Sequence, residues 1–172
     1  MGNGLRFFIP NRLAGFDVPQ GPFTVQKITF AWGETACVKD ASVTSNAVSI
    51  KIDLPAQTLT MKGDRFLLHQ AVGNLVKNAI EHAHPQTEIT VSARAEDKSL
   101  QITVSNIGEP IPDYAIDKLF DRFYSLPNRK GQKGSGIGLS FVREVAKLHG
   151  GQIQITNASS NNVQAQLRLP SN

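Results

Sequence analysis

Three polar side chains recur at every fourth residue of an otherwise apolar stretch. Asn74, Asn78 and His82 are spaced so that on a helix they form one stripe. A second stripe of helical spacing is apolar and contains Leu68, Ala71, Val72, Leu75, Val76, Ala79 and Ile80. Buried amide and imidazole groups need hydrogen-bond partners. A helix over 68–83 therefore presents its polar stripe either to water and loops, the commoner arrangement, or to a ligand pocket.

Two glycine-bearing segments have the residue types that hold parts of a nucleotide. Gly134-Ser135-Gly136-Ile137-Gly138 opens a predicted helix over 137–149, where glycines let backbone amides approach an anion and the helix N-terminus favours phosphate. Asn106 and Gly108 follow a predicted strand, where an amide can contact the edge of a base and a glycine allows the base to lie close. Each segment alone is more often an ordinary turn.

The elements that must position these residues are strands, a central helix and hairpins. The predicted strands are 23–30, 47–54, 59–61, 88–95, 100–104, 153–156 and 163–169. The predicted helices are 68–83, 113–123 and 137–149, the first capped by Asp64. The segment 105–112 is expected to leave the sheet, and 125–136 to be a flexible loop. This order predicts an α+β fold, a two-layer sandwich with helices on one face of a mixed sheet.

Composition indicates one globular domain with a tail. The chain has 172 residues, of which 40% are hydrophobic and 19% charged, enough for a core of its own. Residues 1–22 carry glycines and prolines typical of a tail or linker: Gly2, Gly4, Gly15, Gly21, Pro10, Pro19 and Pro22. We therefore expect a tail over 1–22 and the domain over 23–172.

Charge and cysteine content exclude several classes of protein. The single cysteine, Cys37, precludes an internal disulfide and fits a reducing compartment. No apolar run approaches the roughly 20 residues that span a bilayer, and Pro10, Asn11 and Arg12 interrupt any signal-peptide core. The net charge of +4 is too scattered for nucleic-acid binding. We expect a cytoplasmic protein, or the cytoplasmic part of an inner-membrane sensor.

Taken together, four motifs resemble the ATP-binding domain of sensor histidine kinases, in the Bergerat superfamily with gyrase, Hsp90 and MutL. The motifs are the N box around Asn74 and Asn78, the first glycine box at 106–108, the F box Leu119–Tyr124 and the second glycine box 134–139. The resemblance covers about residues 25–170, in order and at family spacing. The segments 111–115, 120–127 and 131–133 look most like the CreC-type sensor kinases.

The resemblance implies the ligands ATP and Mg²⁺ and a role for each matched position. Asn78 would coordinate Mg²⁺ through its amide oxygen, and Asn74 would lie near the metal or the phosphates. Lys133 or Arg129 would contact the γ-phosphate. The other implied nucleotide-binding positions are His82, Asn106, Gly108, Ile111, Phe120, Phe123, Gly134, Gly136, Ile137, Gly138 and Leu139. Of these, Asn106 would meet the adenine amino group with Gly108 under the ring, and Phe120 and Phe123 would pack the base of the lid and fill the core.

Three positions depart from the family pattern. Asn106 stands where an aspartate is usual, although its amide oxygen can still accept from the adenine amino group. Pro110 replaces a common glycine and stiffens its loop. Glu81 replaces a basic residue, so its carboxylate would repel ATP unless it points away or meets the metal.

The expected partners and the alternative functions depend on two features that this sequence does not show. Related ATPases and anti-sigma-factor serine kinases carry a glutamate where this chain has Asn74, so we expect slow ATP hydrolysis. None of His69, His82, His84 and His149 is followed by the Glu or Asp typical of a phosphoacceptor histidine.

The chain is thus expected to be a monomeric catalytic fragment or a stand-alone module. It would pass the γ-phosphoryl group to a histidine on a separate dimerisation domain, and from there to a response regulator. The alternatives are a serine kinase, which His82 but not the F box suggests, and a degenerate nucleotide-binding module.

Overall fold

The computed structural model describes residues 48–54, 59–96 and 98–171, together with the backbone of five short strands nearer the N-terminus. These five strands are β1 (Arg6–Phe7), β2 (Arg12–Leu13), β3 (Phe16–Asp17), β4 (Phe23–Thr24) and β5 (Gln26–Phe30). The predicted strand over 23–30 thus corresponds to β4 and β5. Most of the predicted tail lies outside the described residues, so the boundary at residue 22 stays a prediction.

Five strands form the main sheet, in the order β10-β11-β9-β8-β6. They are β6 (Ser49–Asp53), β8 (Glu88–Glu96), β9 (Ser99–Ile107), β10 (Gln152–Ser159) and β11 (Asn162–Pro170). β6 pairs parallel with β8, and the other neighbours pair antiparallel. A separate pair joins β5 to β7 (Leu59–Gly63). The prediction of a mixed sheet is therefore confirmed.

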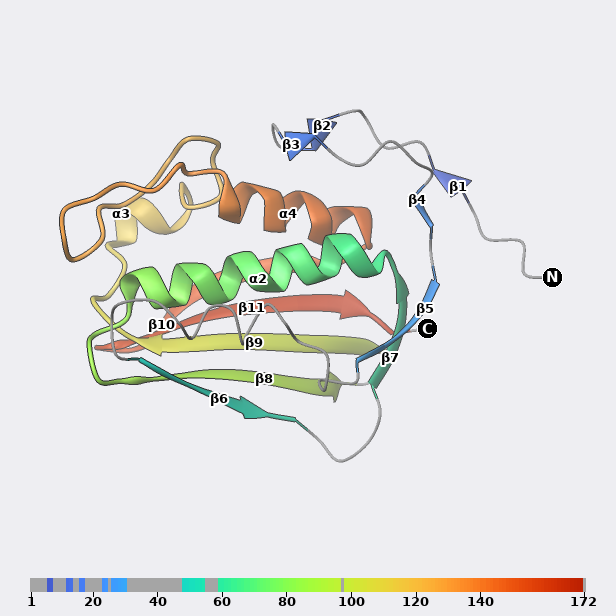
Figure 1. Ribbon diagram of the computed structural model, residues 1–172, viewed down its shortest axis with the longest axis horizontal. Helices are drawn as coiled ribbons and strands as arrows, with labels where there is room; N and C mark the ends of the chain where they lie inside the picture. The colour runs from blue at the N-terminus through green and yellow to red at the C-terminus, as the bar shows by residue number, and fades with distance from the viewer. Residues whose placement is uncertain are drawn as a thin grey trace.

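Two long helices, α2 (Arg65–His82) and α4 (Gly138–Leu148), lie side by side over one face of this sheet (Figure 1). Asp64 caps α2, because its Oδ1 accepts a hydrogen bond from Leu67 N at 3.0 Å. All seven residues of the predicted apolar stripe of α2 are buried, and β9 contributes Leu100, Ile102 and Val104 from alternate positions. The predicted two-layer α/β sandwich is confirmed. None of the described helices is both long and apolar enough to cross a membrane.

Several predicted boundaries are wrong: α2 begins at Arg65 rather than at residue 68, β10 extends to Ser159 rather than to residue 156, and two further differences follow. β9 does not end at Val104, because residues 105–107 still pair with β11, where Asn106 lies opposite Val163 and Ile107 opposite Asn162. The glycine and prolines that break the strand come only after Ile107. The predicted helix 113–123 is a single turn, α3 (Asp113–Ile116), followed by turns.

The chain leaves helical geometry before Phe123, which has a positive φ of 65°. Its backbone N donates to Gly136 O at 3.0 Å, which ties the end of the F box to the glycine segment before α4. A non-glycine residue rarely adopts this left-handed conformation. The tertiary contact with Gly136 thus replaces the last two turns of the expected helix.

Candidate functional site

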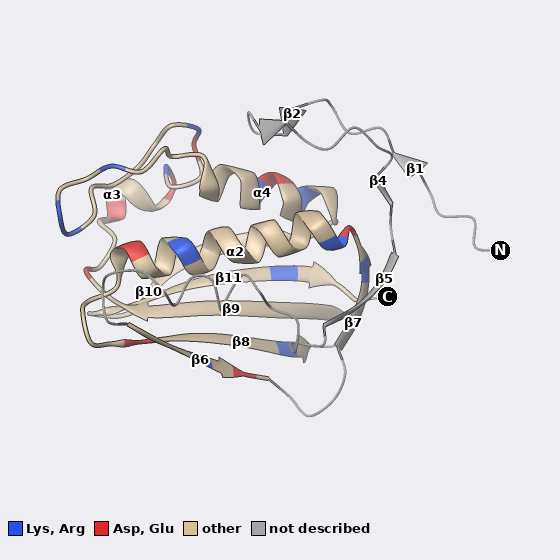
Figure 2. Cartoon of the chain, in the orientation of Figure 1, with Lys and Arg blue, Asp and Glu red and all other residues tan. Residues whose placement is uncertain are grey.

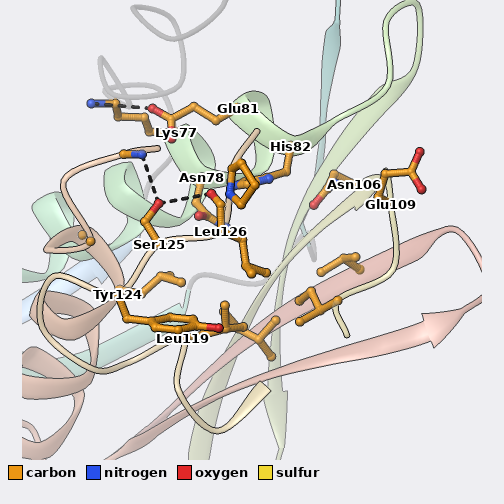
Figure 3. Close-up of a pocket in the computed structure, with 18 of the residues that line it drawn as sticks. Lys77, Asn78, Glu81, His82, Asn106, Glu109, Leu119, Tyr124, Ser125 and Leu126 are labelled. Atoms are coloured by element: carbon orange, nitrogen blue, oxygen red, sulfur yellow. Dashed lines mark hydrogen bonds and ion pairs between the residues drawn. The ribbon is translucent and has the colours of Figure 1, made fainter. Parts of the chain in front are cut away.

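A cavity of about 610 Å³ opens between the C-terminal half of α2, the end of β9, α3 and the segment before α4 (Figure 3). Its volume lies within the range of roughly 300–1,000 Å³ that is usual for small-molecule sites. Its lining combines the polar stripe of α2 with apolar side chains from α3, the F box and the sheet. The cavity therefore has the size and the mixed polarity of a site for a nucleotide.

The polar stripe of α2 faces this cavity. Asn74, Asn78 and His82 all line it, as the pocket interpretation of the sequence predicts. Lys77 and Glu81 join them on the same wall. Burial lowers the pKa of His82 below its usual value, although the negative charge of Glu81 opposes that shift. His82 therefore presents a neutral imidazole at neutral pH.

Asn106 also lines the cavity, beside Glu109 (Figure 3), and is only 5% exposed. Its Nδ2 is buried and has no hydrogen-bond partner within the described part of the chain. A buried polar atom without a partner costs about 1–3 kcal/mol. Such an atom in a cavity wall is an expected feature of a site that a polar ligand or an ordered water completes.

Gly108 allows two elements of the fold to lie close together and is not part of the cavity wall. It does not line the cavity, and a β-carbon at this position would lie 2.4 Å from His82 O and 2.9 Å from Asn106 Nδ2. A β-bridge between Ala83 and Gly108 joins the end of α2 to the end of β9 here. Glycine is thus required because the backbone of β9 passes directly against the last turn of α2.

The second glycine segment borders the cavity through Gly134, Gly136, Gly138 and Leu139, whereas Ile137 does not line it. Gly136 has a φ of +67°, and a β-carbon on it would lie 2.5 Å from the carbonyl carbon of Phe123. Gly134 N donates to Ser125 Oγ at 3.0 Å. The glycine segment at the start of α4 therefore borders the same cavity as the side-chain amides of Asn74 and Asn78, and a helix N-terminus favours an anion.

Besides Gly108 and Ile137, four predicted residues lie outside the cavity wall. Lys133 and Arg129 are exposed on the loop 125–136 and do not line the cavity. Phe120 packs against the core and lines a second hollow of about 530 Å³ beside β10. The prediction that Phe123 packs at the base of the lid and fills the core is wrong, because its side chain is 78% exposed.

About half of the residues that line the cavity were not predicted from the sequence. The residues it did not assign are Lys77, Glu109, Pro112, Tyr114, Leu119, Tyr124, Ser125, Leu126, Pro127, Ser135, Ile155 and Val163. Leu119 and Tyr124 lie inside the quoted F box, so the motif itself was the available signal. Val163 lines the cavity because it pairs with Asn106 across β9 and β11. Predicting this contact requires the register of the two strands.

The residues present fit a magnesium nucleotide. Asn74 and Asn78 bring amide oxygens and Glu81 a carboxylate to the wall that also contains Gly134. Mg²⁺ prefers oxygen ligands and is commonly held by one or two protein groups together with substrate phosphates. The buried amide of Asn106 and the apolar Ile111 and Leu119 offer a polar contact and an apolar surface to a base.

Comparison with known proteins agrees with this geometry. The sequence model of the histidine kinase-, DNA gyrase B- and HSP90-like ATPases matches residues 63–172, so the chain belongs to this family of ATP-binding domains. Sensor protein CreC of Escherichia coli (strain K12) is 47% identical over 103 residues, which cover 60% of this chain and 22% of that protein. The probable sensor kinase SilS of Salmonella typhimurium is 37% identical over 98 residues, covering 55% of this chain and 20% of that protein. The chain thus spans about a fifth of the length of these curated relatives.

Solved structures have the same fold. The catalytic domain of histidine kinase ThkA, in a nucleotide-free form, has a TM-score of 0.69 and 25% identity, covering 85% of this chain and 96% of that chain. The mycobacterial sensor histidine kinase MprB has a TM-score of 0.71 at 20% identity, covering 86% of this chain and 98% of that chain. The domain described here is therefore of the catalytic, ATP-binding type found in sensor histidine kinases.

Proposed function

We propose that this domain binds magnesium ATP in the cavity and donates the γ-phosphoryl group to a histidine on a separate dimerisation domain. A response regulator would be the next acceptor, and the parent protein would be a membrane sensor whose catalytic part lies in the cytoplasm. The observation that carries the proposal is the convergence of Asn78, Asn106 and the glycine segment 134–138 around one cavity. These residues come from three separate elements of the chain.

Each wall of the cavity has its own role in this proposal. Asn78 and Asn74 offer amide oxygens to the metal, which supplies charge neutralisation on the phosphates when bound. Asn106 accepts from the adenine amino group, and Ile111 and Leu119 contact the ring. Backbone amides around Gly136 and Gly138, at the start of α4, hold phosphate oxygens, while Gly134 N donates to Ser125 Oγ. These groups bind and orient, in keeping with phosphoryl transfer that relies on positioning and charge stabilisation.

Lys133 and Arg129 have a conditional role. Both belong to the loop 125–136, which carries them outside the cavity wall in this structure. For either cation to contact the γ-phosphate, the loop must move toward the cavity when nucleotide binds. This requirement also supports a second candidate function, a nucleotide-binding module that signals through loop movement without transferring phosphate.

Phosphotransfer to a supplied acceptor tests the proposal. The chain is incubated with radiolabelled ATP, Mg²⁺ and the dimerisation domain of its own parent kinase, and the product is treated with acid. We expect acid-labile phosphohistidine on that domain, and none with Asn78→Ala. Acid-stable phosphoserine on a partner would favour a serine kinase instead. Nucleotide binding without transfer would favour the binding module.

A further inference from the structure

The cavity wall carries little positive charge for a site that receives a polyphosphate. Among the described Lys, Arg, Asp and Glu residues that line it, Lys77 is the one cation, and Glu81 and Glu109 are carboxylates. Figure 2 shows the positive and the negative charge close together toward the C-terminal end of α2. A nucleotide without metal carries several negative charges, so this wall matches it poorly.

Glu81 is the carboxylate at the phosphate end of the cavity. Its Oε2 lies 3.9 Å from the point that a β-carbon on Gly134 would occupy, beside the glycine segment that borders the cavity. Glu109 lies on the far side of the cavity near Asn106 (Figure 3), where its carboxylate contacts His84 Nε2 at 3.3 Å. Of the two carboxylates, Glu81 is therefore the one that approaching phosphate groups meet.

Lys77 does not cancel this charge. The distance between Lys77 Nζ and Glu81 Oε1 is 3.9 Å, and the two side chains are 75% and 41% exposed. An exposed ion pair of this kind contributes little interaction free energy and is screened by salt. Asn78 lies between them in sequence and three residues before Glu81, so its amide oxygen and the carboxylate project from neighbouring positions of one helix surface.

We propose that Glu81 makes the site selective for magnesium-complexed nucleotide over metal-free nucleotide. This inference rests on the proposed nucleotide-binding function. The Glu81 carboxylate repels phosphate groups that arrive without a metal, and it attracts the divalent cation of a metal complex. The carboxylate that departs from the family pattern thus acts as a specificity determinant of the phosphate subsite.

Calorimetric titration of ADP into the full chain tests this inference, once with excess Mg²⁺ and once with EDTA. For the wild type we expect at least about tenfold tighter binding with Mg²⁺. In Glu81→Gln the ratio should fall to about threefold or less, chiefly because binding in EDTA becomes tighter. This substitution removes the charge and keeps the length of the side chain and one oxygen that can accept a hydrogen bond or bind a metal.

Glu144→Gln is the matched control. Glu144 is a helical glutamate on α4 with a side-chain exposure of 34%, paired with Lys147 at 3.3 Å, and it does not line the cavity. This variant should keep the wild-type ratio. An unchanged ratio in Glu81→Gln would overturn the inference and leave the nucleotide site intact. Absence of binding by the wild type under both conditions would instead contradict the proposed function itself.

Discussion

The side-chain amide of Asn157 on β10 pairs with both backbone polar groups of Ile111. Ile111 N donates to Asn157 Oδ1 at 2.9 Å, and Asn157 Nδ2 donates to Ile111 O at 2.8 Å. Ile111 lies between Pro110 and Pro112 and lines the cavity. One amide thus fixes a segment that leaves the sheet and forms a cavity wall, and it does so from the strand at the sheet edge.

Asn157→Ala should destabilise the protein and weaken nucleotide binding together. The change leaves two backbone groups of Ile111 without their partner, which costs about 1–3 kcal/mol of unfolding free energy. Asn157→Asp keeps the acceptor for Ile111 N and should lose less. Urea denaturation and ADP titration measure the two effects. Ser160→Ala, an exposed change in the turn after β10, is the control, and an effect of Asn157→Ala no larger than this control would refute the role.

His149 links the two long helices in a pH-dependent way. Its Nε2 accepts from Asp64 N at 2.9 Å, and its Nδ1 donates to Val145 O at 2.8 Å, so the bonded form is the neutral imidazole. Burial lowers the pKa of His149, while the Val145 hydrogen bond and the charge of Asp64 oppose the shift. Protonation would remove the acceptor that Asp64 N needs.

The stability due to neutral His149 should therefore be fully present above its unfolded pKa of about 6.5 and fall as the pH drops below that value. The folded state binds the proton less readily than the unfolded state, which sets this sign. Urea denaturation between pH 8 and pH 5 measures it. His82 also has a lowered pKa and makes the unfolding free energy depend on pH with the same sign. The contribution of His149 is therefore the difference between the pH slopes of the wild type and of His149→Gln. Identical slopes would rule out this linkage.

Gly108→Ala should cost more stability than a glycine substitution in the loop. The added carbon would lie 2.4 Å from His82 O, so β9 and α2 must move apart. We expect a loss of about 2–3 kcal/mol, in the range of overpacked cores, with weakened nucleotide binding. Gly131→Ala meets nothing within 4 Å and is strained only by its φ of +73°, so about 1 kcal/mol is expected. Equal losses in thermal or urea unfolding would argue against the close approach.

The sequence predicted those parts of the fold that rest on local periodicity. The apolar stripe and the Asp64 cap placed α2, and the alternation of Leu100, Ile102 and Val104 placed the inward face of β9. Long-range contacts decided the rest. The register of β11 extends β9 to Ile107, and the contact of Phe123 with Gly136 shortens the expected helix.

The same distinction holds for the site. The spacing of Asn74 and Asn78 places them on one side of a helix, and the family resemblance assigned both, with Gly136, to a nucleotide site; all three line the cavity. The place of Val163 in the cavity wall could be predicted only from the register between β9 and β11. The direction of Glu81, toward Gly134 rather than away from the cavity, depends on how the loop packs against α2. Lys133 and Arg129 lie on a loop whose course no periodic pattern determines.

The most direct test of the account is titration of a non-hydrolysable ATP analogue, with Mg²⁺, into the wild type, Asn78→Ala and Asn106→Ala. We expect one binding site in the wild type and binding weakened at least about tenfold in each variant, because each loses a polar contact to the ligand or its metal. No binding at millimolar nucleotide, or equal binding by all three proteins, would contradict the assignment of this cavity as the nucleotide site.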